Sequence, residues 1–153
     1  MSLQTSEKIR TLQNKLYLKA KREPAYRFYL LYDKVWRADI LLHAYGLCRA
    51  NGGAAGVDGV TFADIDESGV EAWLAALVAD LREEKYKPEA VRRVRIPKPD
   101  GGERLLGIPT VRDRVVQQAA KLVLEPIFEA DFEPNAYGYR PKRGALDAVQ
   151  EVH

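Results

Sequence analysis

The sequence has very few residues that form disulfides or bind transition metals. Its 153 residues include one cysteine, Cys48, and two histidines, His43 and His153. One cysteine excludes an internal disulfide and a four-cysteine zinc site. With only this cysteine and two histidines that are far apart in the sequence, a metal cluster is not expected. Cys48 lies in an apolar stretch of helical character, which favours a buried structural thiol.

Long apolar runs are also missing. No run approaches the roughly 20 residues that cross a bilayer, and the polar start MSLQTSEKIRTLQNK is unlike a signal peptide. With 46% apolar and 30% charged residues, the chain has the composition of a single globular domain with one modest core. We therefore expect a cytoplasmic protein without a membrane partner.

The small net charge of +2 conceals alternating blocks of charge. Residues 1–39 hold nine Lys or Arg against four Asp or Glu, and residues 92–114 hold seven against three. The segments 40–91 and 115–153 are acidic. Two basic blocks indicate a polyanionic partner, although solvated surface charge explains them equally well.

Helical periodicity dominates the first half of the chain. Ile9, Leu12 and Leu16 predict an amphipathic helix with a basic face, which Pro24 ends. A second helical stretch is expected from Tyr26 to Asn51, with an interruption near Asp33, and a third over 69–86. The glycine-dense loop NGGAAGVDG, residues 51–59, separates the second from the third.

The pattern changes over residues 91–109. Two β-rich runs flank the sequence PDGG, which predicts a hairpin. Thr110 and Asp113 then fit the start of a long helix in which Pro126 is expected to kink or loosen the last turns. A turn-like segment over 131–141 precedes a last helix that begins near Gly144. The predicted fold is a helix-rich α+β domain with a small antiparallel sheet.

The hairpin carries the most informative group of candidate binding residues. It concentrates long cations that could hold phosphate, with Lys98 as a mobile charge and Arg104 as a planar fork on either side of the turn. The full set is Arg92, Arg93, Arg95, Lys98 and Arg104. A charge-protected edge hairpin has the same features.

Three other segments allow more than one interpretation. The 51–59 loop lacks the Gly-Lys-Ser/Thr ending of a P-loop, so a lid, a close approach to a ligand or a plain connection are the alternatives. DIDESG, residues 64–69, resembles a calcium loop but has Ala75 where a glutamate is required, which favours an acidic helix start. YGYRPKRG, residues 137–144, fits either an RNA site with stacking tyrosines or core tyrosines beside surface cations.

Four blocks in order resemble group II intron reverse transcriptases, also called maturases. They are RFYLLYDKVWRADIL (27–41), NGGAAGVDGVT (51–61), KPDGGERLLGIPTVRDRVVQQAAKLVLEPIFEADF (98–132) and NAYGYRPKRGALDAV (135–149). The resemblance covers the chain from about Leu12 to His153. It implies the fingers, with the start of the palm, of a right-hand polymerase. Residues 1–50 would be a helical amino-terminal extension, and residues 51–153 would be fingers truncated before the catalytic palm.

The resemblance also implies roles for individual residues. Lys98 and Arg104 match the residues that contact the triphosphate of the incoming dNTP, and the 51–59 loop matches a lid over the template–primer junction. The basic amino-terminal helix matches a region that grips intron RNA. The residues expected to bind RNA or template are Asn51, Gly52, Gly56, Asp58, Gly59, Arg92, Arg93, Arg95, Arg112, Arg114, Tyr139, Arg140, Lys142 and Arg143.

The sequence departs from the family pattern at a few positions near these sites. Leu105 stands where the family usually has proline, and Gly102-Glu103 where a more basic pair is common. Lys142, Gly144 and Leu146 replace residues often seen as Gly, Ser and His. These departures affect the fine placement of residues near the hairpin and the YGYRP segment.

The catalytic residues of the family are not in this sequence. The resemblance implies RNA-directed DNA polymerisation with Mg²⁺, whose ligands are an aspartate beyond residue 153 and a later Tyr-x-Asp-Asp box that residues 1–153 lack. The chain alone is therefore expected to bind but not to polymerise. Its expected partners are intron RNA, an RNA template with a DNA primer, dNTP, and the palm and thumb. Apolar surface that would face the palm makes self-association a further expectation.

Two other functions fit the same sequence. One is a stand-alone or remnant RNA-binding module that assists intron folding without catalysis, for which RNA affinity would fall steeply with salt. The other is a scaffold domain with no nucleic-acid partner, which the alternating charge blocks permit.

Overall fold

The computed structural model describes residues 4–138, 140, 141 and 143–152. Within these residues the chain is α+β, as predicted, with several helices and one two-stranded antiparallel sheet. The elements in order are α1 (Glu7–Arg22), α2 (Tyr32–Val35), α3 (Ala38–Asn51), α4 (Phe62–Ser68), α5 (Val70–Arg82), β1 (Arg92–Pro97), β2 (Glu103–Ile108), α6 (Val111–Asp131) and α7 (Ala145–Val152).

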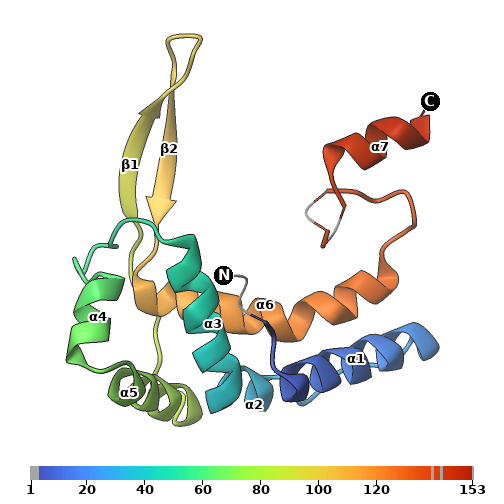
Figure 1. Ribbon diagram of the computed structural model, residues 1–153, viewed down its shortest axis with the longest axis horizontal. Coiled ribbons are helices and arrows are strands. Elements are labelled where there is room, and N and C mark those ends of the chain that lie inside the picture. Colours follow the sequence, from blue (N-terminus) through green and yellow to red (C-terminus); the bar gives the residue numbers. More distant parts are fainter. Residues whose placement is uncertain (1–3, 139, 142, 153) are drawn as a thin grey trace.

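Helix α6 is the centre of the molecule. Figure 1 shows α1 lying alongside one half of α6 while α3 crosses the other half, and these two helix pairs form the main packing contacts. Leu41 of α3 and Val115 and Ala119 of α6 are completely buried, and Ile9 of α1 belongs to the same core. Helices α1 and α3 therefore share one core with α4, α5 and α6.

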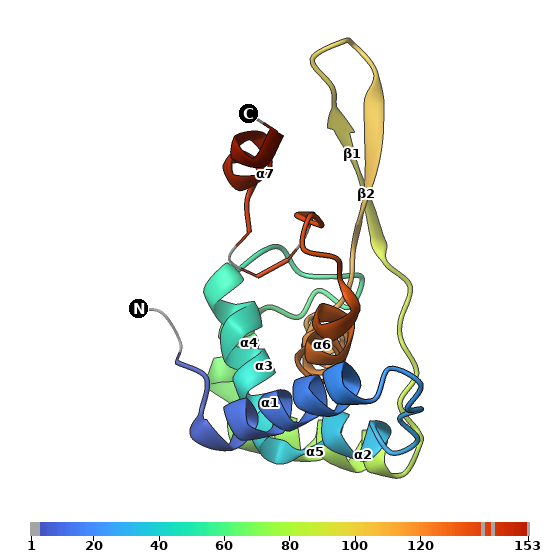
Figure 2. The same ribbon diagram turned by 90° about the vertical axis from the view of Figure 1, so that its right-hand side faces the viewer.

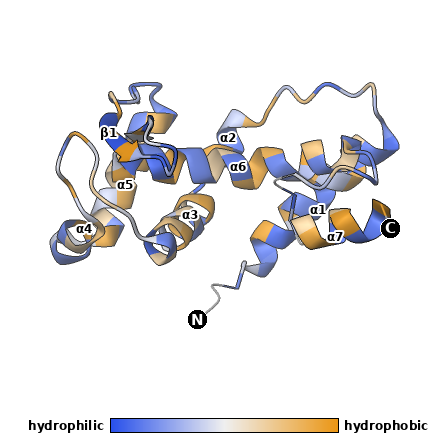
Figure 3. Cartoon of the chain, turned by 90° about the horizontal axis from the view of Figure 1, so that it is seen from above, coloured by the Kyte–Doolittle hydropathy of each residue, from blue (hydrophilic) through white to orange (hydrophobic). Residues whose placement is uncertain are grey.

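Two elements project from this helical base. The β1–β2 hairpin rises near the start of α6, and α7 stands above the other half of α6, on the same side of the base (Figures 1 and 2). Viewed from above, Figure 3 shows apolar residues both on the packed helix α3 and along α7, which has no buried residue. The base is a packed unit, whereas the two projections are exposed.

Local capping explains where several helices begin. Thr110 accepts a hydrogen bond from the Asp113 backbone N–H at the start of α6, as predicted. Thr61 and Asp64 form a complete capping box at the start of α4. The acidic segment 64–68 thus belongs to a short helix of its own, and Gly69, at φ 102°, separates it from α5.

The predicted helix from Tyr26 to Asn51 is wrong over its first residues. Residues 26–31 are not helical, and helix forms only in α2 and α3. The rings of Tyr26 and Phe28 meet edge to face with 5.0 Å between centroids, and the Lys19 ammonium lies 4.1 Å from the Tyr26 ring centre. Residues two apart share a side of an extended chain but not of a helix, so this packing requires an extended segment.

One other helix prediction needs a smaller correction, while the kink expected at Pro126 stays a prediction. The helix predicted to run to Tyr86 ends at Arg82, because the Asp80 carbonyl accepts the N–H groups of Lys85 and Tyr86 and Glu84 adopts φ 56°. Pro126 is buried inside α6, which continues past it to Asp131. The hairpin prediction is confirmed, with Arg92 opposite Ile108 and Pro97 opposite Glu103.

Candidate nucleic-acid interface

The register of the hairpin divides its five cations between two faces. Residues that pair directly across an antiparallel sheet lie on the same face, and side chains alternate along each strand. Arg104 pairs with Ile96. The Lys98 N–H donates to the Gly102 carbonyl at 2.7 Å, which extends the pairing one step towards the turn. We call the side with Arg92, Lys98 and Arg104 the even face, and the side with Arg93, Arg95 and Glu103 the odd face.

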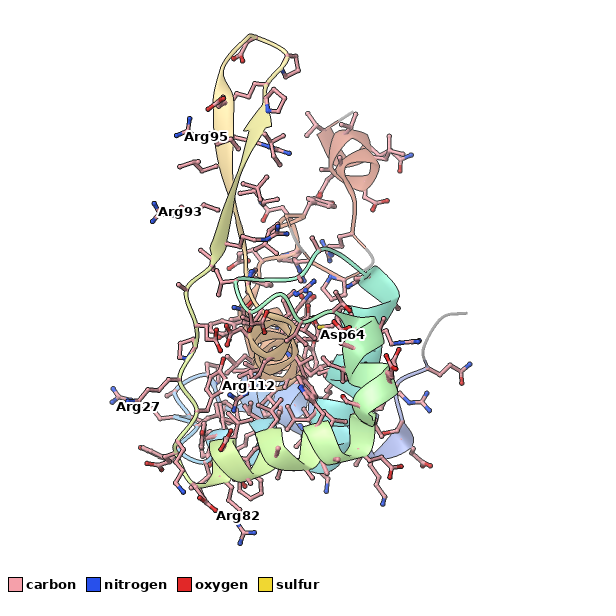
Figure 4. The ribbon with its side chains drawn as sticks, turned by 90° about the vertical axis from the view of Figure 1, so that its left-hand side faces the viewer. Arg27, Asp64, Arg82, Arg93, Arg95 and Arg112 are labelled. Carbon is pink, nitrogen blue, oxygen red and sulfur yellow. The ribbon has the colours of Figure 1, made fainter. Side chains whose placement is uncertain are left out.

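The two faces differ in their internal contacts. On the odd face Arg95 pairs with Glu103 at 3.4 Å, and both side chains are largely exposed. On the even face, Lys98 and Arg104 are exposed and pair with no carboxylate in the described part of the chain. Figure 4 shows Arg93 and Arg95 pointing together away from α7. The even face therefore presents Lys98 and Arg104 without an ion pair, whereas on the odd face only Arg93 is exposed without a carboxylate partner among the described residues.

The glycine loop is packed against α6 rather than projecting into solvent. Arg114 of α6 donates to the carbonyls of Gly52 at 3.2 Å and Ala54 at 2.9 Å. Gly56 is buried, and a Cβ at this position would lie 2.6 Å from the Thr110 Cα. Asn51 ends α3, where Gly52 turns the chain with φ 65°. The first half of the loop is therefore fixed beside the base of the hairpin.

The second half of the loop is more open. Asp58 accepts the Val60 N–H, and a Cβ added at Gly59, where φ is 72°, would have no heavy atom within 4 Å. Beside the first half, a pocket of about 330 Å³ is lined by Cys48, Asn51, Gly52, Arg114, Gln117, Gln118 and Lys121. Burial raises the pKa of the Cys48 thiol, consistent with the predicted structural role.

Arg112 and Arg140 have their guanidinium groups engaged within the chain. Arg112 pairs with Asp80 and lies 5.4 Å from the Tyr86 ring centre, between α6 and α5 in Figure 4. Arg140 pairs with Glu129 at 2.6 Å and donates to the carbonyls of residues 133 and 136. Template contact by these residues stays a prediction, and any such contact would compete with these bonds.

The YGYRP segment is only partly described. Tyr139 and Lys142 lie outside the described residues. The Arg143 guanidinium donates to the Pro134 carbonyl and lies 5.3 Å from the Tyr137 ring centre, while the Tyr137 hydroxyl donates to Glu151. Both residues of this stacked pair are half-buried, and RNA binding by this segment stays a prediction.

A second surface combines cations with aromatic rings. A groove of about 400 Å³ runs between α1 and the segment 26–34. Its lining includes Lys15, Lys19, Tyr26, Phe28, Tyr29 and Lys34. Sequence reasoning predicted the basic helix but not the groove, because the extended 26–31 segment was expected to be helical.

The acidic residues that resembled a calcium loop have structural partners. Asp64 accepts the Thr61 N–H in its capping box, and Asp66 accepts from Tyr45 at 2.7 Å and pairs with Arg49 at 2.6 Å. These bonds, from Tyr45 first and then Arg49, lower the pKa of Asp66. Among the described residues no three His, Cys, Asp or Glu side chains are grouped to hold a metal ion. In the same residues no helix is long and apolar enough to cross a bilayer.

Sequence reasoning missed the contact between Asp113 and Tyr86. Asp113 was expected only as part of a helix start, yet its carboxylate is buried and accepts a hydrogen bond from the Tyr86 hydroxyl at 2.5 Å. The two residues are 27 positions apart, and neither belongs to a periodic pattern that indicates the pairing.

Comparison with known proteins links the chain to intron-encoded proteins. No family model matches it. It is 37% identical over 150 residues to Protein YkfC of Escherichia coli, covering 94% of this chain and 38% of that protein. It is 33% identical over 126 residues to the Group II intron-encoded protein LtrA of Lactococcus lactis, covering 82% of this chain and 21% of that protein. A putative COX1/OXI3 intron 1 protein of Saccharomyces cerevisiae is 31% identical over 114 residues, or 74% of this chain and 13% of that protein. The chain thus spans well under half the length of these relatives.

Proposed function

Because the chain belongs to the group II intron-encoded proteins, we propose that it is the fingers part of an RNA-directed DNA polymerase and maturase. In this proposal the chain binds template RNA and the incoming dNTP, and the palm and thumb complete the polymerase. The parent protein is a nucleotidyltransferase that uses Mg²⁺, whose ligands lie outside the described residues. This chain by itself is inactive.

One observation carries the nucleotide-binding part of the proposal. Lys98 and Arg104 share the even face at the outer end of a projecting hairpin and have no internal carboxylate partner among the described residues. A mobile ammonium and a planar guanidinium on one face of the hairpin suit the oxygens of a triphosphate. Their exposure leaves both groups able to bind without first breaking an ion pair.

Steady-state primer extension with the polymerase that contains this chain tests the proposal. Lys98→Ala and Arg104→Ala should each raise the KM for dNTP roughly tenfold or more and slow incorporation, since one charge-assisted hydrogen bond is worth about 1.5–3 kcal/mol. Lys87→Ala, an exposed cation in the connector before β1, is the matched control and should leave the KM unchanged. Unchanged kinetics in both hairpin variants would exclude the role.

A second candidate function is RNA binding without catalysis. The groove beside α1 favours it, because cations and exposed aromatic side chains together suit single-stranded RNA. Fluorescence anisotropy of labelled RNA over a salt series measures it directly on this chain. Affinity should fall steeply with salt. The logarithmic slope should lessen by about 0.7 for each single-strand phosphate that Lys15→Ala in the groove, or Arg92→Ala or Arg93→Ala in the hairpin, leaves unneutralised. An RNA affinity that does not depend on salt concentration, or no RNA binding, would count against this function.

A further inference from the structure

In the described part of the chain, the hairpin has little support from the helices along its length. Among the described residues, β1 and β2 pack on each other, and no pairing of comparable extent joins either strand to a helix. Most residues of both strands are exposed. A lone two-stranded hairpin is only marginally stable in water. Its direction must therefore be set where it joins the base.

The first leg of the hairpin is attached to α6 through Asp113. The connector between α5 and β1 passes over the start of α6, where the Tyr86 hydroxyl donates to Asp113 Oδ1 at 2.5 Å. The Glu89 backbone N–H donates to the other carboxylate oxygen at 3.1 Å. Asp113 is only 3% exposed, so water does not compete for these bonds.

The second leg reaches the same residue from the other side. Strand β2 ends at Ile108, and two residues later Thr110 caps α6 by accepting the Asp113 backbone N–H at 3.1 Å. Thr110 is 1% exposed and is covered by Gly56 of the glycine loop. Both legs of the hairpin are therefore fastened within one turn of helix.

Comparison with α4 shows that capping alone does not explain the carboxylate. In α4, Asp64 occupies the same third position and returns its carboxylate to the N–H of its own cap, Thr61. In α6 the cap is made by Thr110, while the Asp113 carboxylate turns away to Tyr86 and Glu89. The Asp113 side chain thus serves the connector rather than the helix start.

We infer that Asp113 is a positioning residue that fixes the direction of the hairpin and thereby places Lys98 and Arg104. The second half of this inference rests on the proposed nucleotide-binding function. A six-residue strand is about 20 Å long, so a change in tilt of roughly 10° at the base would move the tip by about 3–4 Å. That displacement exceeds the length of a hydrogen bond and would separate the two cations from a bound triphosphate.

The chain contains a matched control for this contact. Tyr45 donates to Asp66 at 2.7 Å, which is also a bond from a tyrosine hydroxyl to an aspartate, and it lies on α3 and α4 away from the hairpin. Tyr86→Phe and Tyr45→Phe each remove one hydroxyl and one such bond. Only Tyr86 is attached to a leg of the hairpin. An effect that comes merely from lower stability should therefore appear in both variants, whereas an effect on the hairpin's direction should appear only in Tyr86→Phe.

Pulsed electron–electron double resonance, which measures the distance between two spin labels, tests the positioning on the 153-residue chain. Spin labels are placed at Leu105→Cys on β2 and Glu71→Cys on α5, both exposed positions, in a Cys48→Ser background. Tyr86→Phe and Asp113→Asn should broaden the distance distribution roughly twofold as the hairpin gains freedom. Tyr45→Phe should leave the width unchanged. An unchanged width of the distance distribution in Tyr86→Phe would overturn the inference. If Asp113→Asn fails to fold, the result for the milder variant Tyr86→Phe decides the test.

Kinetics separate this inference from the function on which part of it rests. In the intact polymerase, Tyr86→Phe should raise the KM for dNTP several-fold with a smaller effect on kcat, as expected for a misplaced binding residue. Tyr45→Phe should change neither. If the distances broaden while the KM stays constant in Tyr86→Phe, Lys98→Ala and Arg104→Ala, the attachment through Asp113 stands and the nucleotide site is elsewhere.

Discussion

Arg114 is the residue that joins the glycine loop to α6. It donates to two loop carbonyls, and its guanidinium lies 5.3 Å from the ring centre of Phe62 at the start of α4. Replacing it with methionine keeps an apolar stem but removes both donors. We expect Arg114→Met to destabilise the fold by roughly 2 kcal/mol, because two loop carbonyls are left without charged donors.

The control for Arg114 is another arginine stacked on a ring. The Arg82 guanidinium lies 5.9 Å from the Trp36 ring centre. Within the described residues this guanidinium makes no hydrogen bond. Arg82→Met should cost much less stability in urea unfolding and should leave hydrogen exchange of the 52–60 amides unchanged, whereas Arg114→Met should accelerate it. Equal effects of the two substitutions would show that the carbonyl contacts do not hold the loop.

His43 should make stability depend on pH in a defined direction. Burial lowers its pKa, and its Nε2 lies 3.3 Å from the Thr5 hydroxyl. The unfolded chain therefore takes up a proton at about pH 6.5, before the folded chain does, and stability declines as the pH falls from there towards the lower folded pKa. The aspartates with lowered pKa change the stability only below about pH 4. Their contribution is therefore separate from that of His43.

Urea midpoints measured between about pH 6.5 and 5 test this dependence. The parent chain should lose stability on acidification over this range, and His43→Gln should flatten the decline because glutamine does not titrate. Identical slopes for the two proteins would show that His43 is protonated equally in the folded and unfolded chain.

At the scale of elements, the glycine loop offers a paired test of its docking. Gly56→Ala would place a Cβ 2.6 Å from the backbone of Thr110, a contact that only movement of the loop or of α6 can relieve. We expect a loss of about 1–3 kcal/mol in the free energy of unfolding, as for other overpacked sites. Gly59→Ala meets no atom within 4 Å and should cost only about 1 kcal/mol for its positive φ. Equal losses would mean that the loop is not held against α6.

Elements set by local chemistry could be predicted from the sequence. The hairpin follows from Asp-Gly between two β-rich runs, and the start of α6 follows from Thr110 with Asp113. The segment 26–31 could not be predicted, because its extended form depends on rings that pack together and against Lys19 of α1. Helical periodicity alone does not register such contacts.

The candidate site was predictable to the same extent. Alternation from the turn places Lys98 and Arg104 on one face, so their grouping follows from the hairpin alone. The engagement of Arg112 with Asp80 and of Arg114 with the glycine loop joins residues 32 to 62 positions apart. A single sequence shows that such residues are charged, but it does not show which distant residue each of them pairs with.

At the scale of the whole molecule, α7 stands apart from the shared core. Its apolar residues Leu146, Val149 and Val152 are spaced three apart and therefore lie on one side of the helix. Leu146 is 79% exposed and Val152 87%, and Phe128 and Phe132 of α6 are also exposed. Apolar surface of this kind on a projecting helix favours association.

We therefore expect the 153-residue chain to self-associate at high concentration through α7. Light scattering across a dilution series should show a mass that falls towards the monomer on dilution. Leu146→Glu combined with Val149→Glu should keep the chain monomeric, because two charges cannot be buried cheaply in an apolar interface. Leu42→Glu, at a position 55% exposed on α3, is the control and should leave the association unchanged. A parent chain that stays monomeric at every concentration would show that the exposed side of α7 is too small to associate by itself.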